Sequence, residues 1–149
     1  MVAFAARPVL ALCLTAYHIR APAPLAAATI DAADAASRLR SGAAALVDIR
    51  QPAEFRLDGR IDGSVNLPAY SWEHGFHVPL PDFAETVAED LPRDGEILLI
   101  HSYPALADGA ASVLEAAGFS NVASVEGGLN SWEEELIVDD DEGLVGAWV

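Results

Sequence analysis

Short apolar runs and helical patterns alternate along the chain from residue 30 onward. Four runs are typical of short buried strands, at residues 45–49, 64–68, 97–100 and 122–125. Helices are predicted between and after them, at residues 32–40, 52–57, 82–91, 105–117 and 129–136. Strands separated by helices indicate one α/β domain, in which a short parallel β-sheet is flanked by helices on both faces.

Capping and proline signals bound several of these elements. Asp31 is placed to cap the first helix, which ends at Gly42. Pro52 begins the second helix, and Pro68 ends the second strand.

The chain is strongly acidic. It has 149 residues, the size of one domain, and 52% of them are hydrophobic, which excludes disorder for most of its length. It carries 23 acidic residues against 8 basic ones, a formal net charge of −15. Such a surface repels phosphate backbones, so we expect no nucleic-acid partner. We expect protein partners, either basic or membrane-associated.

The two ends of the chain differ from its middle. Residues 1–28 contain no acidic residue, and their apolar run at 9–17 is too short to span a bilayer. We predict a transit-like, signal-like or docking segment at 1–28, a domain at 29–138, and an acidic and apolar tail at 139–149. This pattern favours an organelle, a plastid over a mitochondrion, with export or a cytoplasmic location as alternatives.

The stretch from Ile97 to Phe119 carries the candidate chemistry. A buried strand, a short loop and a helix N-terminus form a cradle for an anion or a nucleophile, because free N–H groups and the helix dipole converge there. This loop begins with His101. The chain has one cysteine, Cys13, so an intrachain disulfide and a cysteine-based metal site are both excluded.

Three further motifs resemble the rhodanese-like domain family over residues 30 to about 138. The first, LVDIRQPAEF, is similar to the family signature through Asp48, Arg50, Glu54 and Phe55. The second, GRIDGSVNLP, matches through Gly59, Ile61, Gly63, Asn66 and Pro68, with Arg60 in place of a histidine. The third, GFSNVASVEGGLNSW, matches through Gly118, Phe119, Gly127, Gly128 and Trp132.

The signature residues suggest structural roles. Asp48 and Arg50 flank a strand end, where a buried ion pair or hydrogen-bond hub with Glu54 would fix the turn. Gly63 and the Gly127–Gly128 pair are expected to supply positive φ angles or close packing.

The resemblance also implies a degenerate active site. In active members the loop begins with a cysteine and contains a glycine and an arginine, and here His101, Pro104 and Leu106 occupy those positions. An imidazole cannot carry a stable persulfide, proline removes one N–H, and leucine removes a cation. We therefore expect no catalytic residue, cofactor or metal in the loop His101, Ser102, Tyr103, Pro104, Ala105, Leu106, Ala107. This predicts an inactive binding or structural module, such as an accessory subunit of a larger organellar or membrane-associated complex.

Two other functions stay open. One is a degenerate sulfurtransferase that uses a thiol from a partner or from Cys13. The other is a metal-dependent hydrolase in which His74 and His77 join His101. Tyr70, Trp72 and Phe76 are expected to pack in the core or a lid, and Tyr103 and Leu106 to give the pocket an apolar rim suited to protein contact.

Overall fold

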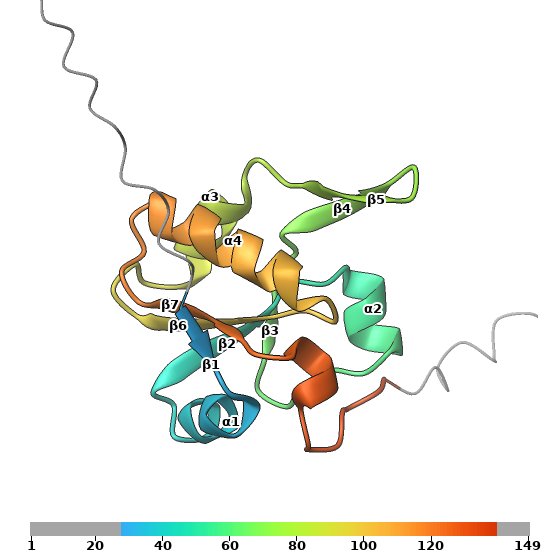
Figure 1. Cartoon of the computed structure of the whole chain (residues 1–149), viewed down its shortest axis with the longest axis vertical. Coiled ribbons are helices and arrows are strands. Elements are labelled where there is room, and N and C mark those ends of the chain that lie inside the picture. Colours follow the sequence, from blue (N-terminus) through green and yellow to red (C-terminus); the bar gives the residue numbers. More distant parts are fainter. Residues whose placement is uncertain (1–27, 140–149) are drawn as a thin grey trace, which may run out of the picture.

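A five-stranded parallel sheet forms the centre of the protein, and the computed structural model describes residues 28–139 of the chain (Figure 1). The strand order is β1-β7-β6-β2-β3, and every neighbouring pair is parallel. The strands are β1 (Ala28–Ile30), β2 (Ala44–Asp48), β3 (Val65–Asn66), β6 (Glu96–Ile100) and β7 (Val122–Val125). The predicted α/β class with a parallel sheet is therefore confirmed.

Helices cover both faces of this sheet (Figure 1). On one face, α3 (Phe83–Asp90) and α4 (Pro104–Ala116) bury Val87 and Leu114 against alternate strand residues such as Leu99. On the other face lie α1 (Ala32–Arg40) and the 3₁₀ helix η1 (Gly128–Ser131). They pack against the strand residues whose side chains point to that face, such as Leu98. The central strands β2, β6 and β7 thus contribute side chains to two separate apolar cores.

One helix and one β-hairpin lie outside the layers formed by the sheet and its covering helices. Helix α2 (Pro52–Leu57) has no buried residue and follows the carboxyl end of β2. The strands β4 (Tyr70–Glu73) and β5 (Phe76–Pro79) form an antiparallel hairpin that projects beside α4 (Figure 1). The sequence pattern does not predict this hairpin. Its two turn residues, His74 and Gly75, have φ angles of 51° and 87°, which are typical of a tight hairpin turn.

The structure corrects the predicted helix at 129–136. Only Gly128–Ser131 is helical, and Trp132 has an extended conformation. Beyond it, Ile137 forms an antiparallel bridge with Arg60, with main-chain hydrogen bonds of 2.7 and 2.8 Å. This pairing draws the segment away from a helical path. It also fixes a conformation that local sequence cannot reveal.

Several predictions concern segments that the structure does not describe. Cys13, residues 1–27 of the predicted N-terminal segment and residues 140–149 of the predicted tail lie outside residues 28–139. Within the described residues, no helix is both long enough and apolar enough to cross a membrane.

Candidate active site

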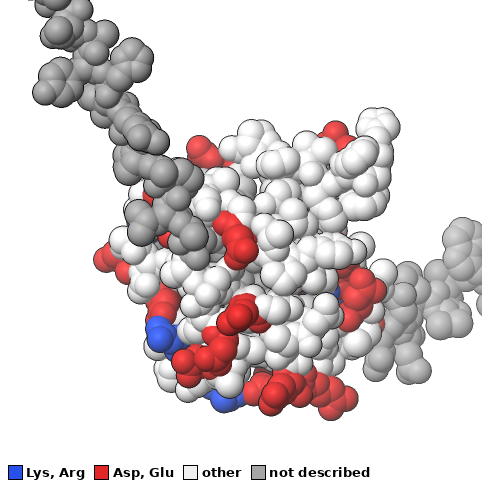
Figure 2. Space-filling view, in the orientation of Figure 1, with Lys and Arg blue, Asp and Glu red and all other residues white. Residues whose placement is uncertain are grey.

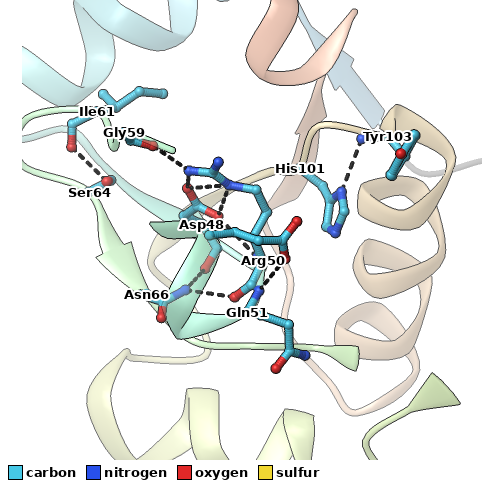
Figure 3. Close-up of polar contacts among 10 residues, drawn as sticks. Asp48, Arg50, Gln51, Gly59, Ile61, Ser64, Asn66, His101 and Tyr103 are labelled. Atoms are coloured by element: carbon cyan, nitrogen blue, oxygen red, sulfur yellow. Dashed lines mark hydrogen bonds and ion pairs between the residues drawn. The ribbon is translucent and has the colours of Figure 1, made fainter. Parts of the chain in front are cut away.

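The carboxyl ends of two neighbouring strands bring the predicted site residues together. Strands β2 and β6 are paired with Asp48 opposite Ile100, and the Ile49 N–H continues this pairing with a 3.1 Å bond to the Ile100 carbonyl. The loops that follow the two strands, one with Arg50 and one with His101, therefore lie side by side (Figure 3). Open α/β sheets bind their ligands at this edge.

Asp48 and Arg50 form a buried ion pair, as expected from the sequence. Their side chains are 0% and 1% exposed. The Arg50 Nη2 lies 2.7 Å from Asp48 Oδ2, and Nε lies 3.0 Å from Oδ1. The same Nη2 donates to the Gly59 carbonyl at 2.7 Å, and the Asn66 amide ties together the Asp48 and Arg50 carbonyls at 2.9 Å each. The guanidinium is thus committed to holding the fold.

Glu54 has a different role from the expected one. Its Oε2 accepts a 3.0 Å hydrogen bond from the Gln51 main-chain N–H, and it does not contact the guanidinium of Arg50. The carboxylate therefore satisfies a free N–H at the start of α2, as in a capping box. The Gln51 side chain in turn donates to the Tyr70 carbonyl, which links α2 to the β4–β5 hairpin.

His101 is buried with one ring nitrogen in use. The residue is 1% exposed. Its Nδ1 accepts a 3.0 Å hydrogen bond from the Tyr103 main-chain N–H (Figure 3). A neutral imidazole that accepts at Nδ1 carries its proton at Nε2. Nε2 has no hydrogen-bond partner among the described residues, so it is available as a donor.

The main chain of His101 is held by the Gly127–Gly128 turn. Its carbonyl accepts a 3.1 Å hydrogen bond from the Leu129 N–H. A Cβ atom on Gly128 would lie 2.2 Å from that carbonyl oxygen, and the φ of Gly128 is 62°. Only glycine allows this approach. The signature glycines of the third motif thus position the loop that carries His101.

The surroundings of His101 keep its ring neutral. Burial lowers the pKa of His101 below its ordinary value of 6.5, because charging the ring there loses hydration. The carboxylates of Glu54 and Asp48 oppose this shift, whereas His77 and Arg50 reinforce it. The net effect favours the uncharged ring, which donates at Nε2 without carrying a positive charge.

An aromatic cluster from the hairpin covers this ring. His77 on β5 stacks edge-on against His101, with ring centroids 5.5 Å apart, and against Trp72 at 4.7 Å. Tyr103 lies 5.7 Å from His101 and 5.8 Å from His77. Trp72 and Tyr103 are nevertheless 59% and 60% exposed. Of the predicted lid residues, Trp72 and Phe76 are exposed and Tyr70 is buried.

The start of α4 is fixed by packing. Pro104 is its first residue, and no side chain caps this end. Leu106 packs against the apolar core, and its carbonyl accepts a 2.8 Å hydrogen bond from the Tyr70 hydroxyl. Burial raises the pKa of Tyr70, which keeps this hydroxyl protonated as a donor. Of the predicted apolar rim, only Tyr103 is strongly exposed.

The structure does not assemble the three-histidine metal site. His77 contacts His101, but His74 lies in the hairpin turn. Within residues 28–139, no group of three or more histidine, cysteine, aspartate or glutamate residues could hold a metal ion. A cavity of about 570 Å³ lies elsewhere, between α1 and η1, and is lined by Ala36, Trp132 and several acidic residues.

Comparisons with known proteins agree with the fold and the motifs. The family model of the rhodanese-like domain matches residues 31–135. The chain therefore belongs to the rhodanese-like family. It is 37% identical over 98 residues to the thiosulfate sulfurtransferase GlpE of Ectopseudomonas mendocina, covering 65% of this chain and 77% of that protein. The Pseudomonas aeruginosa GlpE is 30% identical over 112 residues, covering 75% and 90%.

Solved structures give the same fold. A crystal structure of the Alr3790 protein from Anabaena aligns with a TM-score of 0.56 at 26% identity, over 69% of this chain and 74% of that one. The solution structure of the rhodanese-like domain of the same protein aligns with a TM-score of 0.60 at 24% identity, over 76% and 82%.

These relatives overturn the expectation of an inactive binding module. They are named as enzymes, and nothing in the comparisons supports an inactive domain. The sequence interpretation gave the three loop substitutions more weight than the similarity of the whole domain. The family's associated activity is sulfur transfer, and the open sulfurtransferase alternative agrees better with these findings.

Proposed function

We propose that this protein is a sulfurtransferase that passes sulfur directly from a donor to a thiol acceptor, without carrying it on its own loop. The observation that carries the proposal is His101, a buried and neutral imidazole with an uncommitted Nε2–H at the carboxyl end of β6. The enzyme names of the relatives support the reaction class.

Direct transfer follows from the chemistry of the loop. No cysteine lies within the described residues, and an imidazole does not store sulfur as a stable persulfide. In the proposed step, the thiolate of the acceptor attacks the outer sulfur of the donor. A new S–S bond forms, the bond between that sulfur and the rest of the donor breaks, and its electron pair leaves with the donor fragment.

His101 stabilises the departing fragment in this step. Negative charge grows on the leaving group, and the Nε2–H of His101 donates a hydrogen bond to it. The Tyr103 N–H donates a hydrogen bond to Nδ1 of His101, so the Nε2–H group of the same ring is already oriented before the reaction begins. His101 is 1% exposed and His77 covers its ring, so movement of the hairpin that carries His77 would widen the access of substrate to Nε2.

Steady-state kinetics and mass spectrometry test this proposal. With dithiothreitol as acceptor and either thiosulfate or an organic hydropersulfide as donor, we expect turnover with sequential kinetics. The protein treated with donor alone should gain no sulfur. Cys13→Ser should retain activity. Absence of turnover with both donors contradicts the proposal, and loss of activity in Cys13→Ser shows that the chain supplies the thiol itself.

A further inference from the structure

The described surroundings of His101 lack a free positive charge. The groups whose charge acts on its ring are Glu54, His77, Asp48 and Arg50, and Arg50 is bound to Asp48 within the buried pair. Among the described residues, the carboxylate of Glu54 forms no salt bridge with an arginine. Three other arginines are paired with carboxylates elsewhere: Arg38 with Glu96, Arg40 with Glu134, and Arg60 with Asp139. The Nε of Arg56 on α2 donates to the Pro52 carbonyl, and Arg93 lies over the Phe119 ring.

The entrance to the same site is aromatic. Trp72 and Tyr103 are 59% and 60% exposed, and the ring of His77 contacts those of Trp72, Tyr103 and His101. Figure 2 shows the hairpin as an almost uncharged region, whereas acidic side chains gather on the part of this face near α1 and η1. Clustered exposed aromatic side chains mark a binding surface, and ring faces and edges make favourable contacts with sulfur.

We infer that this site selects a hydropersulfide with an uncharged, apolar body as its sulfur donor, in preference to the thiosulfate dianion. The inference rests on the proposed function. A thiolate acceptor and thiosulfate together bring three negative charges beside Glu54. A thiolate and a hydropersulfide in its protonated form, the form that accepts attack at its outer sulfur, bring one, and the apolar body of the donor packs on the exposed rings.

The transfer balances without an added oxidant or reductant. The acceptor thiolate R′–S⁻ attacks the outer sulfur of R–S–SH. The bond between R′–S and that sulfur forms as the donor's own S–S bond breaks, and the electron pair remains on the inner sulfur. The products are R′–S–SH and R–S⁻, and the Nε2–H of His101 donates a hydrogen bond to the thiolate that leaves.

A donor series on the full-length protein tests this choice. The kcat/KM values are compared for benzyl hydropersulfide, its 4-carboxybenzyl analogue and thiosulfate, with dithiothreitol as acceptor and uncatalysed exchange subtracted. We expect the benzyl donor to exceed both anionic donors by about tenfold or more. Equal or better use of thiosulfate overturns the inference and leaves the proposed function standing. No turnover with any donor overturns the proposed function, and the inference with it.

A positive charge introduced beside His101 tests whether charge sets the choice of sulfur donor. Tyr103→Arg places a positive charge at a strongly exposed position whose ring lies 5.7 Å from His101, and Tyr103→Gln is the uncharged control. We expect Tyr103→Arg to raise kcat/KM for thiosulfate about tenfold above the control, with the gain shrinking at high salt. If the two variants use thiosulfate equally at low salt, charge does not set donor choice and the inference is wrong.

Discussion

Two neighbouring units of this protein have the same local design. In each, a buried polar residue lies at the end of a buried parallel strand or directly after it, a short loop leads onward, and a helix begins at a proline. In the β2–α2 unit the polar residue is Asp48, and in the β6–α4 unit it is His101. The two strand ends are hydrogen-bonded neighbours, so they share one edge of the sheet.

The units differ in how far their polar groups are satisfied. Both carboxylate oxygens of Asp48 are bound by Arg50, whose guanidinium also reaches the Gly59 carbonyl. His101 uses only Nδ1, and its Nε2 has no partner in the described part of the chain. A fully bonded buried pair has no capacity left for a ligand, whereas an uncommitted donor at a sheet edge does. The first unit therefore stabilises the fold, and the second is the unit in which the proposed reaction is placed.

The largest change in the free energy of unfolding is expected from breaking the buried ion pair between Asp48 and Arg50. Asp48→Ala leaves the guanidinium of Arg50 buried and uncompensated, so it should lower the free energy of unfolding by about 3–5 kcal/mol. Urea denaturation measures this loss. The double variant Asp48→Leu/Arg50→Met removes both charges and should be much less destabilised. If the double variant loses as much as the single one, the pair is not the source of the effect.

The second prediction separates the two nitrogens of His101. His101→Asn keeps an acceptor near the position of Nδ1 but loses the Nε2 donor, so the bond from Tyr103 survives. We expect its stability to change by less than about 1 kcal/mol and its kcat/KM for sulfur transfer to fall about 10²–10³-fold.

His101→Gln is the matched control for that variant. Its amide places an N–H donor near the Nε2 position but loses the acceptor at Nδ1. It should therefore retain more activity than His101→Asn and be destabilised by about 1–3 kcal/mol, because the Tyr103 N–H is left unpaired. The reverse ranking of the two variants in activity would show that Nε2 is not the working nitrogen.

Much of the β2–α2 unit could be predicted from the sequence, because its signals are local. The short apolar strand, Pro52 at the helix start and the spacing of Asp48 and Arg50 all lie within a dozen residues. The predicted group of Asp48, Arg50 and Glu54 was wrong only in Glu54, whose carboxylate accepts a hydrogen bond from the nearby Gln51 N–H. The same local patterns predicted β6, β7 and α4 to within a few residues.

The surroundings of His101 could not be predicted because they depend on distant contacts. The aromatic cover comes from the β4–β5 hairpin, whose turn places the non-glycine residue His74 at positive φ, an uncommon conformation. The sequence analysis paired His77 with His101 as a metal ligand, and the structure brings the two rings together without a third ligand. Strand β1 was missed for a similar reason, since its pairing with β7 joins residues that are far apart in the chain.

The third prediction concerns the turn that supports the β6–α4 unit. Gly128→Ala places a Cβ atom 2.2 Å from the His101 carbonyl oxygen, so the loop must shift. We expect a loss of about 2–4 kcal/mol in the free energy of unfolding, together with reduced sulfur transfer.

Gly42→Ala is the control for backbone strain. Gly42 has a φ of 71°, but nothing lies within 4 Å of its Cβ position. This variant should cost about 1–2 kcal/mol and leave activity unchanged. If the two alanine variants are equally destabilised and equally active, close approach to the His101 carbonyl does not matter.

The smallest expected effect is a pH dependence that distinguishes His101 from the paired charges. Burial holds the pKa of His101 in the folded protein below the value of 6.5 that it has in the unfolded chain. As the pH falls below 6.5, the unfolded chain binds a proton before the folded one does, so stability decreases until the folded ring also titrates. Within that window, one unbalanced proton changes the free energy of unfolding by at most about 1.4 kcal/mol per pH unit.

NMR titration of the His101 ring and urea denaturation between pH 7 and pH 5 measure this effect. The ring resonances should titrate below pH 6.5, and His101→Asn should lose less stability than the wild type as the pH falls. The other titratable groups are present in both proteins, so the difference between them reports the loss of this imidazole together with its coupling to His77. A His101 midpoint at or above 6.5 would show that the folded site favours the charged ring, and Nε2 would then act as a cationic donor instead of a neutral one.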